Sequence, residues 1–156
     1  KTDYLSFETG FNHQIDFGML GYLVYNCRFY RFVNQKAIAF PDFFHFAGNK
    51  TIVSDFRAED FAYLDYYKYS TTRNALAIHA EYNLNRFITN KIPLIRKLKL
   101  NEVVGFHFLK VAELKSHYEL TVGLEKLGAI RADFVCSYDG KASPFYSFRF
   151  GLKLRQ

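Results

Sequence analysis

The carboxyl-terminal part of the chain alternates strictly between apolar and polar residues. The even-numbered positions from Tyr146 to Leu154 are all apolar, whereas the odd-numbered positions from Ser147 to Lys153 are Ser, Arg, Gly and Lys. Successive side chains of a β-strand point to opposite faces, so this segment predicts a strand with one apolar and one charged face. A tilted strand of about ten residues is long enough to cross the hydrocarbon core of a bilayer.

Alternation of this kind recurs along the chain and predicts seven strands. They cover residues 2–11, 17–33, 74–85, 100–111, 117–126, 129–138 and 145–154. A turn is expected at residues 12–16, and a long loop at 34–72, where Pro41 disfavours a central strand. Residues 86–99 have nearly helical spacing, which predicts either a short amphipathic turn-helix or an ordinary surface connection. The predicted fold class is therefore all-β and antiparallel, within one domain.

The composition adds an unusual number of aromatic residues. The chain has 18 Phe and 12 Tyr, and its hydrophobic content is 49%. This aromatic content suits β-structure and also the girdles at the rims of outer-membrane β-barrels. No run of 18 apolar residues occurs, which excludes a transmembrane helix at the level of the sequence. The mean hydropathy of −0.15 fits either a soluble protein or a barrel whose interior is polar.

Charge and cysteine content give weaker signals. The net charge of +6 indicates either a solvated basic surface or attraction to the phosphates of lipid head groups. Nucleic acid is disfavoured as a partner, because the basic residues do not gather with aromatic residues on one face as a base-stacking platform requires. Cys27 and Cys136 fit no metal-binding or redox spacing, and the sequence leaves open whether they form a disulfide.

The alternation by itself fits two opposite orientations of the strands. A soluble sandwich or ligand-binding barrel would turn the apolar face inward, whereas a transmembrane barrel would turn it outward. The membrane orientation is favoured by long, uninterrupted apolar faces and by tyrosines near the ends of strands, namely Tyr82, Tyr118, Tyr138 and Tyr146. A slip of one residue would place basic side chains in lipid at about 2–4 kcal/mol each near the midplane, which fixes the register.

In the membrane orientation, alternate residues of each strand face lipid and the residues between them face the interior of the barrel. The residues expected to face lipid are Leu76, Ile78, Leu120, Val122, Phe134, Phe148, Phe150 and Leu152. The residues expected to form a polar network inside the barrel are His79, Glu81, Glu119, Glu125, Arg131, Asp133 and Arg149. Bacterial single-chain barrels have even numbers of strands, so seven strands predict that residues 1–156 are the carboxyl-terminal portion of a larger barrel. The start at Lys1, without Met or a signal segment, also suggests a processed chain or a piece of one.

The sequence shows no signature of a metal, cofactor or catalytic site. The five histidines lack paired metal-ligand spacing, and neither a nucleophile elbow nor a phosphate-binding glycine loop occurs. His79 and Glu81 share a polar face, as do His117 and Glu119, so each pair could support general-base chemistry or simply belong to a hydrogen-bond network. We therefore expect a non-catalytic protein with no cofactor and no bound metal.

Several stretches resemble one family of Bacteroidota outer-membrane barrels of uncharacterised function, in which a carboxypeptidase-regulatory-like domain precedes the barrel. The similar stretches are residues 40–52, 65–71, 90–105, 123–125 and 131–135. The most specific is the third, which ends in Glu102-Val103-Val104-Gly105. The resemblance covers nearly the whole chain. It implies a location in the bacterial outer membrane, with lipid, lipopolysaccharide and other envelope proteins as partners.

More distantly, the layout is similar to the last strands of the BamA/TamA surface-antigen superfamily. There, a long extracellular loop folds back into the lumen before the last five strands, and residues 34–72 occupy that place here. The resemblance implies a lumen-loop tip at Gly48, Asn49 and Lys50, although the Val-Arg-Gly-Phe/Tyr motif of the superfamily is missing. Residues 112–116 and 139–144 would then face outside, whereas residues 86–99 and the turn near 127–128 would face the periplasm.

Together these features predict a BamA-like outer-membrane barrel that acts in envelope protein assembly, export or scaffolding. Two alternatives stay open at this point. One is a barrel-embedded hydrolase that uses histidine and acidic residues inside the barrel. The other is a soluble β-sandwich or ligand-binding barrel, in which Phe148, Phe150 and Leu152 would be buried together.

Overall fold

The structure is a computed structural model that describes residues 2–48, 50–126, 129–140 and 143–152. Its strands are β1 (Asp3–Asp16), β2 (Tyr22–Ala37), β3 (Val53–Asp55), β4 (Ala75–Asn83), β5 (Leu100–Val111), β6 (His117–Lys126), β7 (Ile130–Tyr138) and β8 (Phe145–Leu152). Its short helices are η1 (Gly18–Leu20), η2 (Phe40–Asp42), η3 (Thr89–Lys91) and α1 (Pro93–Arg96). None of the helices in these ranges is long and apolar enough to span a membrane.

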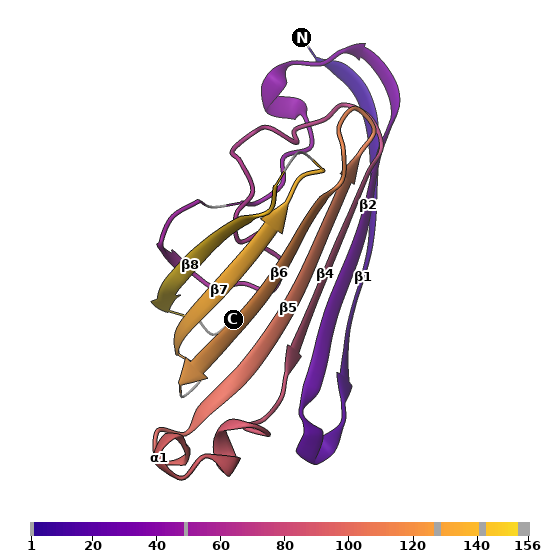
Figure 1. Cartoon of the computed structure of the whole chain (residues 1–156). Helices are drawn as coiled ribbons and strands as arrows, with labels where there is room; N and C mark the ends of the chain where they lie inside the picture. Colours follow the sequence, from indigo (N-terminus) through magenta and orange to yellow (C-terminus); the bar gives the residue numbers. More distant parts are fainter. Residues whose placement is uncertain (1, 49, 127–128, 141–142, 153–156) are drawn as a thin grey trace.

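The strands form one curved sheet in the order β1-β2-β4-β5-β6-β7-β8-β3 (Figure 1). Every pairing from β1 to β8 is antiparallel, which confirms the predicted all-β, antiparallel class. The sheet is not closed, because β1 and β3 lie at its two ends rather than pairing with each other. Among the strands of the described residues, β3 alone is parallel to its neighbour: Val53 pairs with Phe150 and Asp55 with Leu152. The sequence did not predict this strand, which lies inside the long loop.

The first hairpin is longer than its sequence predicts. Strand β1 continues to Asp16, so the expected turn at residues 12–16 is wrong. The turn lies instead between Phe17 and Gly21, where Gly18 and Gly21 have positive φ angles of 63° and 105°. Glycine adopts these angles without steric cost, and the Asp16 carboxylate accepts a hydrogen bond of 2.7 Å from the Gly18 N–H. Glycine placement thus decides where the chain reverses.

The connection from β4 to β5 contains two single turns rather than one amphipathic helix. Residues Thr89–Lys91 form η3 and Pro93–Arg96 form α1, with Pro93 in the first turn, where its missing N–H is not needed. The carboxylate of Glu102 accepts hydrogen bonds from the backbone N–H groups of Ile88 and Thr89. The connection is therefore fixed to the start of β5.

The two faces of the sheet differ sharply in exposure. Along β6, residues alternate between buried and exposed without a break from His117 to Lys126. The buried residues are the polar ones, so the charged side chains lie on one face of the sheet, here called the covered face. The large apolar side chains lie on the other, here called the open face. The cover over the polar face is the long loop between β2 and β4, which folds back across the sheet (Figure 1). The apolar core lies between this loop and the sheet and includes Phe61, Leu64 and Leu109.

Candidate functional site

The candidate site is the polar face of β4–β8 together with the loop that covers it. Because side chains alternate along each strand, every second side chain of these five neighbouring strands projects toward the loop. These residues are almost completely shielded: Glu119 is 1% exposed, and Arg131 and Asp133 are 3% exposed. Charged groups are rarely buried to this degree unless they are paired, so each of them must find a partner on this face.

Arg131 forms the centre of an ion-pair network that crosses the sheet. Its Nε donates to Asp133 Oδ1 at 2.8 Å, and its Nη1 donates to Glu81 Oε2 at 2.6 Å. Glu81 lies on β4 and Arg131 on β7, so the guanidinium group reaches across β5 and β6. Those two strands present Gly105 and Gly123 on this face, opposite Glu81 and Asp133 in the register. A Cβ atom at Gly123 would collide with the Asp133 carboxylate, so the network needs a glycine there.

Phe56 connects the loop to the same network. Its ring is 4% exposed, and it lies 5.1 Å from the guanidinium carbon of Arg131 and 4.8 Å from that of Arg149. A guanidinium group over an aromatic face is attracted by the quadrupole of the ring, more strongly when both are shielded from water. The backbone N–H of Phe56 also donates to the Leu152 carbonyl at 3.2 Å. The loop thereby closes over the cations of β7 and β8.

Glu119 is the second anchor of the loop. Its two carboxylate oxygens accept hydrogen bonds from the backbone N–H groups of Ala62 and Tyr63, at 2.5 and 2.9 Å. The Nε2 atom of His117 lies 2.7 Å from the same carboxylate. Hydrogen bonds to a shielded carboxylate are stronger than those between neutral groups. A buried acidic side chain of β6 therefore determines where the middle of the loop lies.

Three histidine rings surround Phe61 of the loop. The ring of Phe61 lies 4.6, 6.1 and 5.9 Å from the ring centroids of His79, His107 and His117, respectively. His79 Nδ1 and His107 Nδ1 are 2.9 Å apart, so one ring donates to the other. His79 is therefore paired with His107, while Glu81 is paired with Arg131. The structure joins His117 to Glu119 as a histidine–acid pair.

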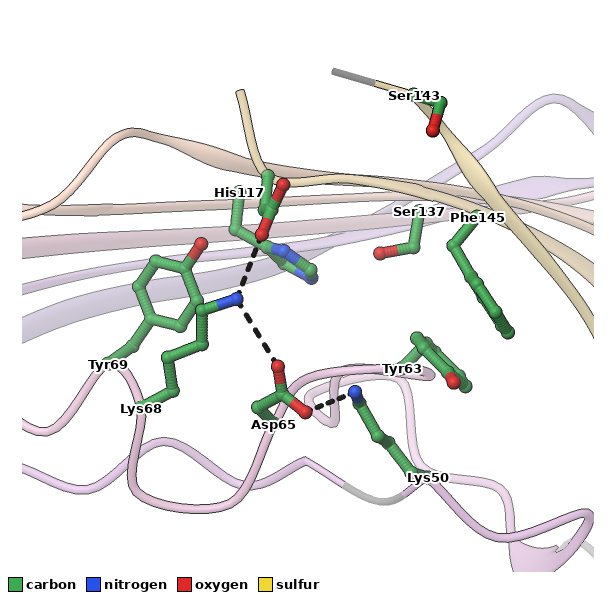
Figure 2. A pocket seen from close by; sticks show the side chains of 10 residues that line it. Lys50, Tyr63, Asp65, Lys68, Tyr69, His117, Ser137, Ser143 and Phe145 are labelled. Carbon is green, nitrogen blue, oxygen red and sulfur yellow. Dashed lines mark hydrogen bonds and ion pairs between the residues drawn. The ribbon is translucent and has the colours of Figure 1, made fainter. Parts of the chain in front are cut away.

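A polar cavity of about 310 Å³ lies beside these anchors, at the end of the sheet where β6 begins and β7 ends (Figure 2). Lys68 of the loop bridges Asp65 and Asp139, at 3.2 and 2.8 Å. Lys50 pairs with Asp65 and also lies 4.6 Å from the ring centroid of Tyr63. The wall therefore carries two lysines and two aspartates in one connected chain.

The ion pairs beside the cavity shift the protonation equilibria of the loop. Hydrogen bonding from Lys50, reinforced by Lys68, lowers the pKa of Asp65 below its ordinary value. Hydrogen bonding to Asp139 and to Asp65 raises the pKa of Lys68. Farther along the loop, burial raises the pKa of Asp60. The ionised forms of Asp65 and Lys68 are thus favoured by folding, whereas that of Asp60 is disfavoured.

The structure places the residues assigned to the polar network on the covered face. Arg131 forms ion pairs with Glu81 and Asp133. Glu125 is buried on the same face, opposite Arg131 in the register. The residues assigned to lipid lie on the opposite, open face, with Phe148 at 70% exposure.

The expected loop tip lies partly outside the described residues. Asn49 is not described. Gly48 bridges to Phe61, and its backbone packs so closely on Leu64 that a Cβ atom would not fit. Lys50 pairs with Asp65. Gly48 and Lys50 therefore both contact other residues of the same loop.

Three residues in or beside this site escaped the sequence-based assignment. Glu102 orients the β4–β5 connection, His107 pairs with His79, and Phe56 lies between two arginines. The alternation along β5 contained a usable signal for His107, which shares a face with Gly105. It contained none for Glu102, which pairs with Leu124 and so has the parity of the apolar face. Phe56 lies in an irregular segment, where no periodic signal exists.

Cys27 and Cys136 are both free thiols, on β2 and β7. Among the residues that the structure describes, no group of three or more histidine, cysteine or acidic side chains could hold a metal ion. The possibility of a disulfide between the two cysteines, left open by the sequence, is not realised in this structure.

Comparison with known proteins adds one finding. The chain matches none of the curated proteins and none of the solved structures with which it was compared. A family model does match residues 1–124, which is well over half of the 156 residues, and it describes the C-terminal domain of a family of unknown function, DUF5686. The chain therefore belongs to the DUF5686 family, as part of its C-terminal domain.

Proposed function

We propose that this chain is part of a β-barrel in the bacterial outer membrane, with its open face against the acyl chains. The observation that supports the proposal is the inverted distribution of side chains: ionised groups are shielded under the loop, whereas large apolar groups are exposed. Phe148, Phe150 and Leu152 are 70%, 55% and 58% exposed. A soluble domain of this size rarely leaves whole strand faces apolar in water, because contiguous exposed apolar patches promote association.

The exposed apolar surface is continuous over neighbouring strands. In the register, Leu120 of β6 lies opposite Cys136 of β7, and Val122 lies opposite Phe134, which in turn faces Phe148 of β8. Such rows across a sheet are the pattern of a lipid-facing barrel wall. Their outward direction makes the covered, charged side the interior of the proposed barrel.

Aromatic residues mark the end of the sheet at which β6 starts. Tyr118 pairs with Tyr138 in the register, and Tyr146 stacks on Phe134 with ring centroids 5.8 Å apart. Their exposed fractions are 40%, 42% and 58% for the three tyrosines. Rings with an apolar body and a polar tip suit the boundary between hydrocarbon and water. This row therefore supports a bilayer rim at that level.

We further propose a non-catalytic role in envelope protein assembly, export or scaffolding, with a barrel of the BamA type. Lipid, lipopolysaccharide and other envelope proteins are the proposed partners. The support for this role is that the acidic side chains of the covered face are already bound, either by the loop or by Arg131. Both oxygens of Glu119 are used to hold the loop backbone, and the carboxylates of Glu81 and Asp133 are used by Arg131. These acids are committed to structure, whereas a catalytic base would need access to a substrate.

The test is a charge placed on the open face. Phe148→Arg would cost little in a soluble domain, because surface substitutions usually change stability by less than about 0.5 kcal/mol. In a barrel wall the same change costs about 2–4 kcal/mol near the midplane. The full-length protein, which contains the whole proposed barrel, is refolded into phosphatidylcholine vesicles, and folding is measured by the shift in gel mobility between unheated and boiled samples. Tyr66→Arg, at an exposed position of the loop, is the matched control.

The expected result is a heat-sensitive compact band for the unmodified protein, a lower urea midpoint for Phe148→Arg and no change for Tyr66→Arg. The opposite result would be a protein that never inserts, or a Phe148→Arg variant as stable as the control. Either outcome would contradict the lipid-facing assignment.

A further inference from the structure

The connection between β4 and β5 concentrates positive charge at one end of the sheet. Between residues 86 and 101 the chain has five basic residues and no acidic residue. The basic residues are Arg86, Lys91, Arg96, Lys97 and Lys99. Among the described residues, none forms an ion pair with this group. Figure 1 places the connection, labelled α1, at the opposite end of the sheet from the N-terminus and the β5–β6 turn.

The same connection leaves its apolar side chains uncovered. Leu94 is 83% exposed, Ile88 is 52% exposed and Leu98 is 49% exposed. Phe87 and Ile92 are also exposed, and the ammonium group of Lys91 lies 4.1 Å from the ring centroid of Phe87. Basic and large apolar residues mixed on one short segment are the composition of elements that lie in the interface of a membrane.

This exposure is not the result of a loosely held turn. The Thr89 hydroxyl donates to the Leu100 carbonyl at 2.6 Å, and Thr89 itself is 6% exposed. Glu102 accepts the backbone N–H groups of Ile88 and Thr89 while being 7% exposed. Thr89 is thus buried against β5, whereas most of the large apolar and basic side chains of the connection are exposed. The fold fixes the segment in the orientation that presents them.

The neighbouring turn of the first hairpin extends the exposed apolar surface. Met19 is 90% exposed, and Phe17 and Leu20 are 47% and 54% exposed. The hydroxyl of Tyr82, on the apolar face of β4, donates to the Leu20 carbonyl at 2.7 Å, which holds this turn beside the start of the connection. The apolar surface therefore runs from the open sheet face onto the turns at this end.

We infer that residues 86–99 form a binding surface for anionic phospholipids. The basic side chains contact the phosphates of the head groups, and Leu94 and its apolar neighbours enter the boundary of the acyl chains. An acidic protein surface would match the charges but would leave the apolar residues in water. A lipid leaflet supplies phosphate and hydrocarbon at adjoining depths, and the open sheet face leads directly to it. This inference rests on the proposed function, because it requires the sheet to stand in a bilayer.

The test compares two lipids around the folded protein. A fluorophore is attached at Asn90→Cys in a background in which Cys27 and Cys136 are replaced by Ser. The full-length protein is refolded into vesicles of phosphatidylglycerol and phosphatidylcholine in equal amounts, in which one or the other lipid is brominated, and quenching reports which lipid lies near the label. Each basic residue near a surface contributes up to about a fivefold preference for an anionic surface, so we expect at least about fivefold stronger quenching by phosphatidylglycerol. This preference should decline in 1 M salt, where the Debye length is only about 3 Å.

Two charge-matched variants identify the surface. The first variant replaces four residues of the connection by Gln, namely Lys91, Arg96, Lys97 and Lys99. It should bring the ratio of quenching by phosphatidylglycerol to quenching by phosphatidylcholine close to one. The control variant replaces four basic residues at the opposite end of the strands by Gln, namely Arg31, Lys36, Arg73 and Lys110. Its quenching ratio should equal that of the unmodified protein.

The two proposals fail in distinguishable ways. If neither lipid quenches the label and no heat-sensitive compact band appears, the barrel proposal fails. If the band appears and both lipids quench the unmodified protein equally, the barrel proposal stands and the phospholipid surface is refuted. A preference that is lost equally in both variants would also refute it, because net charge rather than this segment would be responsible.

Discussion

Replacing Arg131 by Met should destabilise the sheet strongly. The Arg131 side chain is 4% exposed, and its two partners Asp133 and Glu81 are 2% and 10% exposed. Arg131→Met leaves two carboxylates on a shielded face without their cation. Removing one partner of a buried ion pair costs about 3–5 kcal/mol, mostly because the remaining charge is left uncompensated. We expect a loss of that size in the free energy of unfolding.

The assay is equilibrium unfolding in urea, followed by gel mobility on protein refolded into vesicles. With a slope of about 1–3 kcal/mol per molar urea, the expected loss lowers the midpoint by at least about 1 M. Arg73→Met is the matched control. Its Nε lies 3.4 Å from Glu113 Oε1, but its side chain is 70% exposed, so the pair contributes less than about 1 kcal/mol.

A rescue experiment separates charge from shape. Combining Arg131→Met with Glu81→Gln and Asp133→Asn removes the stranded negative charges and should recover much of the lost stability. The reasoning would be refuted by an Arg131→Met variant with an unchanged midpoint. It would also be refuted if the triple variant were as unstable as the single one, since the loss would then come from packing alone.

Three further predictions concern the covered face and the loop. Gly123→Ala should cost about 1–3 kcal/mol, measured by urea unfolding, because the added methyl group collides with the Asp133 carboxylate. Glu119→Gln should speed tryptic cleavage of the loop, since it weakens two charge-assisted backbone hydrogen bonds of about 1.5–3 kcal/mol each. Because Asp65 has a lowered pKa, its stabilising contribution is complete above the ordinary value of 3.8 and is lost as the pH falls through the folded value. Hydrogen exchange of the loop, corrected for intrinsic pH dependence, should therefore rise in acid, and Asp65→Asn should remove that rise.

Most of the sheet could be predicted from the sequence because its strands alternate without interruption. The bounds of β5 and β6, 100–111 and 117–126, are those that the alternation predicts. The first turn could not be placed, because residues 12–16 contain residue types common in turns and yet pair with β2. Strand β3 could not be found either. Three residues show no period, and their partner Leu152 lies almost a hundred positions away.

The sequence predicted on which face of the sheet each side chain of the site lies, but not which side chains pair with one another. Alternation alone places Glu81 and Arg131 on the same face. Their contact depends on the register of four strands and on the small residues Gly105 and Gly123 between them. For the same reason, His79 was grouped with Glu81 on its own strand, whereas its hydrogen-bond partner is His107 on the next one.

The long loop also has a consequence for the order in which the chain folds. Strands β4 to β8 pair with their neighbours in sequence, so each hairpin can form with little loss of chain entropy. The contacts from Phe56 to Arg149 and from Ala62 to Glu119 join distant positions and require partners on strands that are already paired. Refolding should therefore show a fast phase for the hairpins and a later, separate phase in which the loop settles, and Phe56→Leu should retard only the second.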